Sequence, residues 1–475
     1  MRASLYLSEH AVRPRRAESS NLTQNALASE PGFIPRASDR RCPGRHTGIR
    51  CTGDRRTDLV DSNKGVDESP LHRNRSFLIL WTGGVLSGVG SSMSTLVFPL
   101  VGFALTGSTF LAGLAATGVL TGELLGRLVS GPLVDRWPHR RTLTVANVAA
   151  TVSMSSVAAA SLTHTLSLIH LVLAGLAIGV ADAFVGPAVS AAIRHAVPIG
   201  QLPLAYTRIQ VREHLATLIG PPLGGALYSI ARSVPFIVDA ISYLTFGLLS
   251  SRLPTTTRTS DQPSRSFLSD ARDGFVFVWR HSSVRAILMW GGMFNFALAY
   301  VFTAVTLRLI RDGVNPVAIG LIDTVAAAAG LIGAVAAGRI VATFRTGRLT
   351  MSTGLALAVI VAPMGLTTNV VLIGALFAAG IVLLPANNAG ISAFIASVTP
   401  THLQARVNAA GGVFSLGLAP LAPPAAGLSV AAAGGPASMF IGSALLVASL
   451  APLAASRDVR GLSKPAHWPT TALSS

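Results

Sequence analysis

The sequence predicts an all-α integral membrane protein with twelve transmembrane helices in two six-helix halves, preceded by a disordered N-terminal tail. Three observations support this prediction. Only 12% of the 475 residues are charged, whereas a soluble globular protein carries roughly 25%. The hydrophobic residues make up 50% of the chain, and the mean hydropathy is +0.56. From Phe77 onward, apolar runs follow one another, each close to the ~20 residues needed to cross a bilayer.

Residues 1–73 form a polar tail ahead of the first apolar run. They are rich in arginine and aperiodic and lack the apolar stretch of a signal peptide, so we expect them to be disordered. The chain has 35 arginines and 2 lysines, which indicates a GC-rich gene in which valine codons often serve as translation starts. One hypothesis is therefore a start at Val66, with part of the tail never translated.

Twelve apolar runs follow the tail, and each is expected to form one span. Their approximate cores are residues 77–104, 110–133, 142–162, 167–189, 207–230, 234–251, 286–308, 315–338, 349–366, 369–395, 407–430 and 435–455. The longest polar interruption, 252–285, is expected to be a cytoplasmic central loop between halves at 74–251 and 286–456, and residues 457–475 a cytoplasmic tail. Two halves of nearly equal length are typical of transporters built from two repeats with a site between them.

Basic residues are distributed unevenly between the predicted loops. Counted from residue 73, the loops on the side of the N-terminal tail hold 21 Lys and Arg, and those on the opposite side hold three. Because basic loops favour the cytoplasm, both termini are expected there, in a bacterial cytoplasmic membrane. The net charge of +17 then reflects membrane orientation rather than nucleic-acid binding. We expect a monomer whose partners are the lipid bilayer and a small-molecule substrate.

Several classes of protein are excluded by missing motifs. The only lysines, Lys64 and Lys464, are followed by Gly and Pro, so the chain has no phosphate-binding P-loop. It has no His-Glu-x-x-His zinc motif, and Cys42 and Cys51 lie outside the hydrophobic region. We therefore expect no enzyme, no metal and no cofactor, with transport driven by an ion gradient, in our interpretation one of protons.

A charged loop follows the second apolar run. It reads Gly131-Pro-Leu-Val-Asp135-Arg136-Trp-Pro-His-Arg140-Arg141. It resembles the signature of the major facilitator superfamily at this loop, usually Gly-x-Leu-x-Asp-Arg-x-Gly-Arg-Arg, with proline and histidine replacing a glycine and an arginine. A carboxylate and several guanidiniums at helix ends can form a latch that differs between conformations. The alternative is an ordinary basic loop with one acid.

The fifth apolar run carries a second motif, Gly220-Pro221-Pro222-Leu223-Gly224-Gly225. It resembles the Gly-Pro-x-x-Gly-Gly element that exporters of the same family carry in this helix. Prolines weaken the helix, and glycines let a neighbouring helix approach closely, which suits a seam that closes one side of a cavity. The resemblance implies the twelve-helix fold, alternating access by a rocker switch, and export rather than uptake.

Three further stretches extend the resemblance, which covers about residues 74–456, to the subgroup of macrolide-efflux and enterobactin-exporter proteins. They are Asn74-Arg-Ser-Phe-Leu-Ile-Leu-Trp81, Arg212-Glu213 and Pro235-Phe-Ile-Val-Asp239-Ala-Ile-Ser. The implied function is proton-driven export of amphipathic drugs, macrolides or siderophore-like compounds. One alternative is an importer or facilitator of small metabolites with the same fold. Another is a degenerate member acting as a membrane sensor or scaffold, because the loop after the eighth run lacks the signature aspartate.

Ionisable and amide side chains within the spans are the candidates for coupling or substrate binding. They are Glu123, Arg127, Asp182, Asp323, Asn295 and Asn387. An ionisable group at bilayer depth costs at least ~2.5 kcal/mol, so each is a functional candidate. Glu123 and Arg127 share a helix face and form either a structural pair or a titratable pair facing the cavity. If Glu123 titrates, Glu123→Gln abolishes proton-driven accumulation yet leaves downhill exchange. Asp239 is expected to be interfacial.

Replacing Asp135 with Asn is expected to lower transport sharply, because it removes the negative charge of the latch while preserving the size of the side chain. Expression and membrane insertion should stay normal, since the loop lies outside the apolar runs. Transport rates in membrane vesicles, compared at equal expression, measure the effect. Wild-type transport by the Asn variant would contradict the latch.

Overall fold

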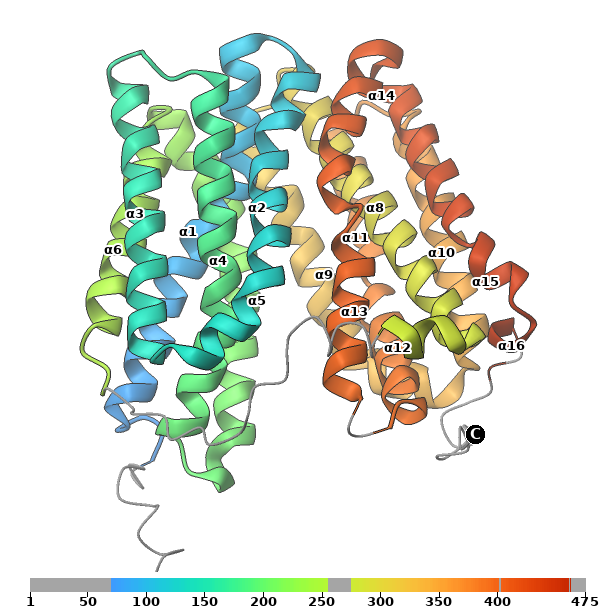
Figure 1. The fold of residues 1–475 in the computed structure, drawn as a ribbon. Helices are drawn as coiled ribbons and strands as arrows, with labels where there is room; N and C mark the ends of the chain where they lie inside the picture. The colour runs from blue at the N-terminus through green and yellow to red at the C-terminus, as the bar shows by residue number, and fades with distance from the viewer. Residues whose placement is uncertain (1–69, 255–274, 401–402, 461, 463–475) are drawn as a thin grey trace, which may run out of the picture. The chain divides into compact units, whose positions relative to one another are not determined.

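The computed structural model describes residues 70–254, 275–400, 403–460 and 462. All of them belong to one of the two compact units of the chain, Ser62–Ser475. Within these residues the secondary structure is helical, with no strand (Figure 1). The predicted N-terminal tail, most of the central loop and most of the C-terminal tail lie outside the described residues.

Six long helices form the N-terminal half. They are α1 (Arg75–Thr106), α2 (Thr109–Arg136), α3 (His139–Leu162), α4 (Leu168–Ala196), α5 (Leu202–Ile230) and α6 (Val234–Ser250), with the short 3-10 helix η2 (Ile199–Gln201) before α5. Three capping residues define both ends of α1 and the start of α2. The Asn74 side chain accepts from the backbone N–H of Phe77 and starts α1, and Gly107, at φ 67°, ends it. Ser108 then caps the start of α2.

The C-terminal half contains more breaks than the N-terminal half. Its helices are α8 (Ser282–Arg311), α9 (Pro316–Thr343), α10 (Thr346–Met364), α11 (Val370–Ile381), α12 (Leu384–Val398), α13 (Gln404–Leu416), η3 (Ala419–Leu421), α14 (Ala422–Ser449), α15 (Ala451–Ala455) and α16 (Arg457–Arg460). The run expected at 369–395 is split into α11 and α12, because Pro385 lacks the N–H that would continue the helix. Helix α14 turns at Gly434, whose φ of 82° is left-handed.

Nine segments of the described chain are long and apolar enough to cross a membrane. One of them, Gly411–Ala455, has 45 residues and contains the turn at Gly434, so it provides two crossings. The shorter apolar helix α6 and the polar-flanked α5 provide the crossings that remain in the twelve-span interpretation. The chain is therefore a multi-pass membrane protein, with span boundaries close to those expected.

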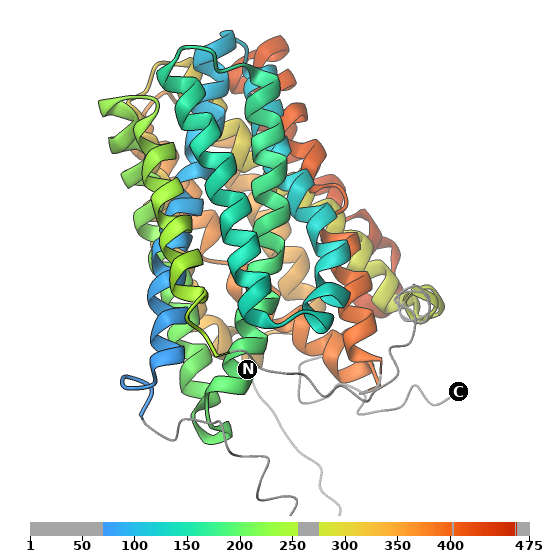
Figure 2. The same cartoon turned by 60° about the vertical axis from the view of Figure 1, so that its left-hand side comes forward.

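The two halves lie side by side and repeat one packing pattern (Figure 1, Figure 2). In the N-terminal half α1 packs against α5 and α6, and α4 packs against α2 and α3. The halves meet along two helix pairs, α2 with α14 and α5 with α9. We call these two contacts between the halves crossings.

The ends of the bundle differ in charge. We call the end that holds Gly107 and the turn at Gly434 the closed end; it is the upper end in Figure 1. The opposite, basic end holds the start of α1 and the α2–α3, α4–α5 and α9–α10 connections. Arginines at these connections, among them Arg140, Arg194 and Arg345, are exposed.

Candidate functional site: an interior between two crossings

The first crossing joins α5 to α9 through backbone atoms. A Cβ on Gly320 would lie 2.5 Å from the carbonyl oxygen of Pro221, and one on Gly225 would lie 2.4 Å from that of Pro316. The hydroxyl of Thr324 donates to the carbonyl of Leu218 at 2.8 Å. Only glycine allows the two backbones to approach this closely.

The second crossing, α2 with α14, repeats this arrangement. A Cβ on Gly113 would lie 2.4 Å from the carbonyl oxygen of Pro423, and one on Gly427 would lie 2.3 Å from that of Thr109. The hydroxyl of Thr109 donates to the carbonyl of Gly427 at 2.9 Å. Each crossing thus combines a glycine on each helix with one threonine hydroxyl bonded to the backbone of the other half.

The two crossings also share a sequence pattern that the sequence reasoning missed. Pro-Pro-x-x-Gly occurs at residues 221–225 in α5 and again at residues 423–427 in α14. The signal is an internal repeat between the halves. The resemblance to the exporter element concerns the fifth run alone and does not indicate the counterpart in the eleventh.

The remaining glycines of the α5 motif face α1. A Cβ on Gly220 would lie 2.4 Å from Cβ of Ser92, and one on Gly224 would lie 3.1 Å from Cα and Cβ of Met93. The motif therefore lies between α1 of its own half and α9 of the other half. This placement agrees with the packed seam expected from the sequence.

Glu123 and Arg127 form an ion pair on α2. The pair lies on the interior side, because α4 covers one flank of α2 at Gly122 and Leu125, on the far face, is 47% exposed. The Glu123 and Arg127 side chains are 32% and 55% exposed. Both side chains are thus partly exposed on the face of α2 opposite Leu125.

Asp182 lies at the middle of α4 and belongs to a polar network with α1 and α6. The Tyr243 hydroxyl donates to both carboxylate oxygens of Asp182 at 3.1 Å. Ser91 lies 3.4 Å from Asp182 Oδ2 and 2.8 Å from the Tyr243 hydroxyl. Asp182 itself is half-buried.

Asp239 lies one turn away from Tyr243 on α6, near the start of that helix, and is buried between helices. Its side chain is 0% exposed. Ser94 donates to one carboxylate oxygen at 2.6 Å and Ser242 to the other at 3.1 Å. A Cβ on Gly90 would lie 2.0 Å from Oδ1, so this glycine of α1 provides the space for the carboxylate. The missed signal is the serine spacing in α1.

Asp323 faces the interior from α9. Leu321 and Val325, each two residues away and therefore on the opposite face, are 50% and 48% exposed. Asp323 is half-buried and has no hydrogen-bond or ion-pair partner among the described side chains. It is the candidate acid of the C-terminal half.

The asparagine candidates differ in their surroundings. Asn295 donates to the carbonyl of Gly291 on its own helix at 2.8 Å. Asn387 is 1% exposed, and neither its oxygen nor its nitrogen has a partner in the described part of the chain. Its neighbour Asn388 is exposed. A substrate can therefore reach Asn388 more easily than Asn387.

The charged loop after α2 is described in part. Gly131, Asp135 and Arg136 belong to the last turns of α2, but their side chains lie outside the described part of the structure. Arg140 and Arg141 are exposed at the start of α3. The latch hypothesis for this loop therefore stays a prediction.

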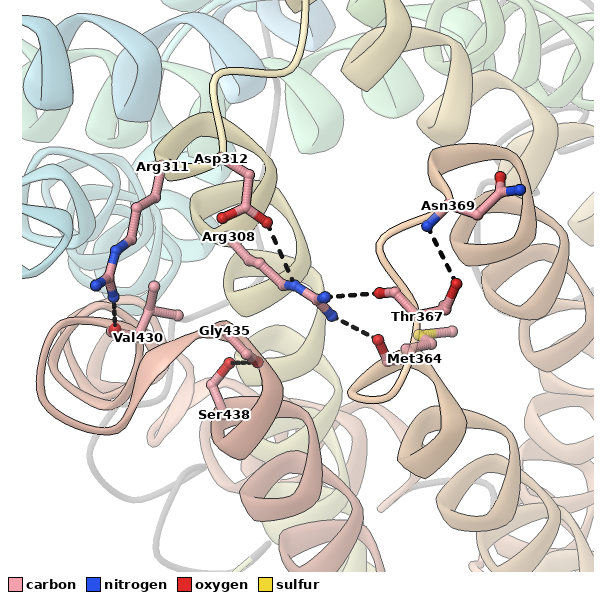
Figure 3. Close-up of polar contacts among 9 residues, drawn as sticks. All are labelled: Arg308, Arg311, Asp312, Met364, Thr367, Asn369, Val430, Gly435 and Ser438. Carbon is pink, nitrogen blue, oxygen red and sulfur yellow. Dashed lines mark hydrogen bonds and ion pairs between the residues drawn. The ribbon is translucent and has the colours of Figure 1, made fainter.

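Two arginines at the end of α8 organise the closed end of the C-terminal half (Figure 3). Arg308, 3% exposed, donates to the carbonyls of Met364 and Thr367 in the α10–α11 connection, the latter at 2.7 Å. Its Nε lies 3.6 Å from Asp312, and its chain fills the space beside Gly435. Arg311 donates to the carbonyl of Val430, in the last turn before α14 bends.

The role of Arg308 was not predicted, because the sequence shows only an arginine at the end of an apolar run. Its position, three residues before Arg311 near the end of a span, is equally typical of an exposed loop charge. The buried contacts depend on the α10–α11 connection, which is distant in sequence. Among the described residues, no group of three or more His, Cys, Asp or Glu could hold a metal ion.

Residues 80–410 match the Major Facilitator Superfamily. The chain belongs to this family of membrane transporters, and nothing in the described structure points to catalysis. A search of curated proteins found no match.

Solved structures of similar fold include a bacterial homologue of the iron transporter ferroportin in an inward-facing state, with a TM-score of 0.65 and 14% identity over 81% of this chain and 99% of that one. A bacterial homologue of the human lysosomal transporter Spinster, inward-facing and unoccupied, has a TM-score of 0.61 and 17% identity over 82% and 97%. A mutant of the nucleoside transporter NupG has a TM-score of 0.62 and 12% identity over 80% and 99%. These likenesses establish the fold alone.

Proposed function

We propose that the protein exports amphipathic small molecules across a bacterial cytoplasmic membrane by alternating access, in exchange for protons. The observation that carries the proposal is the placement of acidic side chains within the spans of both halves. Glu123, Asp182 and Asp323 come from both halves, and each lies on a helix face turned away from exposed apolar residues. Such acids at bilayer depth mark substrate and ion pathways.

The two crossings support alternating access. They hold the halves together near the closed end through matched glycines, so a rocking motion can separate them there without breaking a side-chain core. The inward-facing relatives have the same fold. The excess of basic residues in the loops of the basic end supports an orientation in which this end faces the cytoplasm. In that orientation the end near which both crossings lie faces outward.

Drug susceptibility tests this function. An efflux-deficient bacterial host expressing the full chain should grow at higher concentrations of some amphipathic compounds in a panel that includes ethidium, erythromycin and a catechol siderophore. Resistance should disappear when the proton gradient is dissipated. Equal growth with and without expression across the panel, together with uptake of a small metabolite in the same cells, would favour an importer instead.

A further inference from the structure

We propose that Asp182 carries the proton exchanged for substrate, and that Tyr243 is its positioning residue. The proposal rests on the proposed function and deepens it. From sequence alone Glu123 is the favoured carrier. The contacts of the two carboxylates differ in a way that reverses this preference.

The first step concerns what each acid touches. Glu123 is paired with Arg127 one turn along its own helix, so its charge is balanced by a base that moves with it. Among the described residues, the side-chain hydrogen bonds of Asp182 are with hydroxyls, those of Tyr243 and Ser91. A carboxyl without a basic partner can take up a proton without leaving a cation unpaired.

The second step concerns the hydroxyls. A hydroxyl both donates and accepts, so the network can serve either form of Asp182. When Asp182 is ionised, Tyr243 donates to it. When Asp182 is protonated, its O–H donates to the Tyr243 oxygen, and Tyr243 donates to Ser91 at 2.8 Å. Each hydroxyl keeps its own hydrogen and only reverses direction, so a single proton is bound or released.

The third step concerns access. Asp182 is half-buried, and a Cβ on Gly186, one turn towards the basic end and itself exposed, would meet no atom within 4 Å. Open space therefore lies beside Asp182 on the side of the basic end. Asp239, at 0% exposure, lacks such access, which assigns it a packing role between α1 and α6.

The fourth step concerns the surrounding charges. Asp182 interacts electrostatically with Glu123 of α2, and Asp239 interacts with Asp182 from α6. In the described chain, no charged group of α1, α3 or α5 joins Glu123 and Asp239 in this interaction with Asp182. Since α4 contacts α1 and α2 and, through Tyr243, α6, a proton on Asp182 changes the charge at the centre of the N-terminal half.

The experiment uses the full chain in liposomes with an imposed pH gradient, and ethidium and erythromycin as probes. Asp182→Asn should lose gradient-driven accumulation at least tenfold, while exchange without a gradient and thermal stability remain. Asp182→Glu should restore part of the accumulation. Tyr243→Phe should shift the pH dependence of gradient-driven accumulation. Asp312→Asn, an exposed acid at the closed end, is the matched control and should behave as the wild type.

Infrared difference spectra of the purified chain at stepped pH give a readout independent of transport. One component of the carboxylic-acid band that appears on acidification should be lost in Asp182→Asn, shift in Tyr243→Phe and persist in Glu123→Gln. Wild-type accumulation by Asp182→Asn, or an unchanged band, would overturn the assignment while export stands. A joint loss of exchange and stability in Asp182→Asn would also overturn it, in favour of a structural role. Absence of any gradient-driven accumulation by the wild type would instead refute proton-driven export.

Discussion

Gly320→Leu is expected to reduce transport by about 10- to 100-fold. A β-carbon at this position would lie 2.5 Å from the carbonyl oxygen of Pro221, so α5 and α9 must separate. Overpacking of this kind costs typically 1–3 kcal/mol. A cost of this size lowers the population of the conformation in which the crossing is formed by roughly the 10- to 100-fold expected for transport. Transport in proteoliposomes measures the loss, and spin-label distances across the closed end measure the separation.

The same helix supplies the control. A β-carbon on Gly338 of α9 would meet nothing within 4 Å, so Gly338→Leu should leave transport and the spin-label distances unchanged. Both substitutions replace glycine by leucine in one helix, and their effects on helix propensity therefore cancel. Equal transport by the two variants would show that the α5–α9 contact is not needed in the cycle. Gly427→Leu tests the α2–α14 crossing in the same way.

Arg308→Ala is expected to lower the free energy of unfolding by about 2–5 kcal/mol, because it leaves two carbonyls without their donor and opens a space beside Gly435. The ion pair with Asp312 adds little, since the Asp312 side chain is 49% exposed. Thermal unfolding in detergent measures the change. We expect the variant to lose stability while it still binds substrate.

Arg311 provides the comparison for Arg308. Its side chain is exposed and donates to one carbonyl, that of Val430, so Arg311→Ala should destabilise the protein by no more than ~1 kcal/mol. Arg308→Lys keeps the charge but loses the planar fork that serves two carbonyls at once. It should therefore be intermediate. If Arg308→Ala is as stable as Arg311→Ala, the contacts of Figure 3 do not hold the closed end together.

Most of the fold could be predicted from the sequence, because each span is a local property of its own residues. The interruption at 252–285 and the near-equal halves follow from hydropathy in the same way. The positions at which helices break were harder to predict. Gly434 lies between two predicted spans and its turn was expected, whereas the split at Pro385 was not, although the missing N–H of a proline is a local signal.

The residues of the candidate site could be predicted from the sequence, but most of their side-chain contacts could not. The acids were found because charges are rare in apolar runs, and the pairing of Glu123 with Arg127 follows from their spacing. The contact of Asp182 with Tyr243 joins residues 61 positions apart, and that of Ser94 with Asp239 joins residues 145 apart. No local pattern encodes such pairs, since they arise only when α1, α4 and α6 pack together.

The two crossings have a consequence for how this protein can evolve. They are built from missing β-carbons, backbone carbonyls and two threonine hydroxyls, and use none of the side chains that line the interior. Selection for a new cargo can therefore replace interior side chains freely without disturbing these contacts between the halves. Descendants of such a transporter would differ in their substrates and keep the same crossings between the two halves.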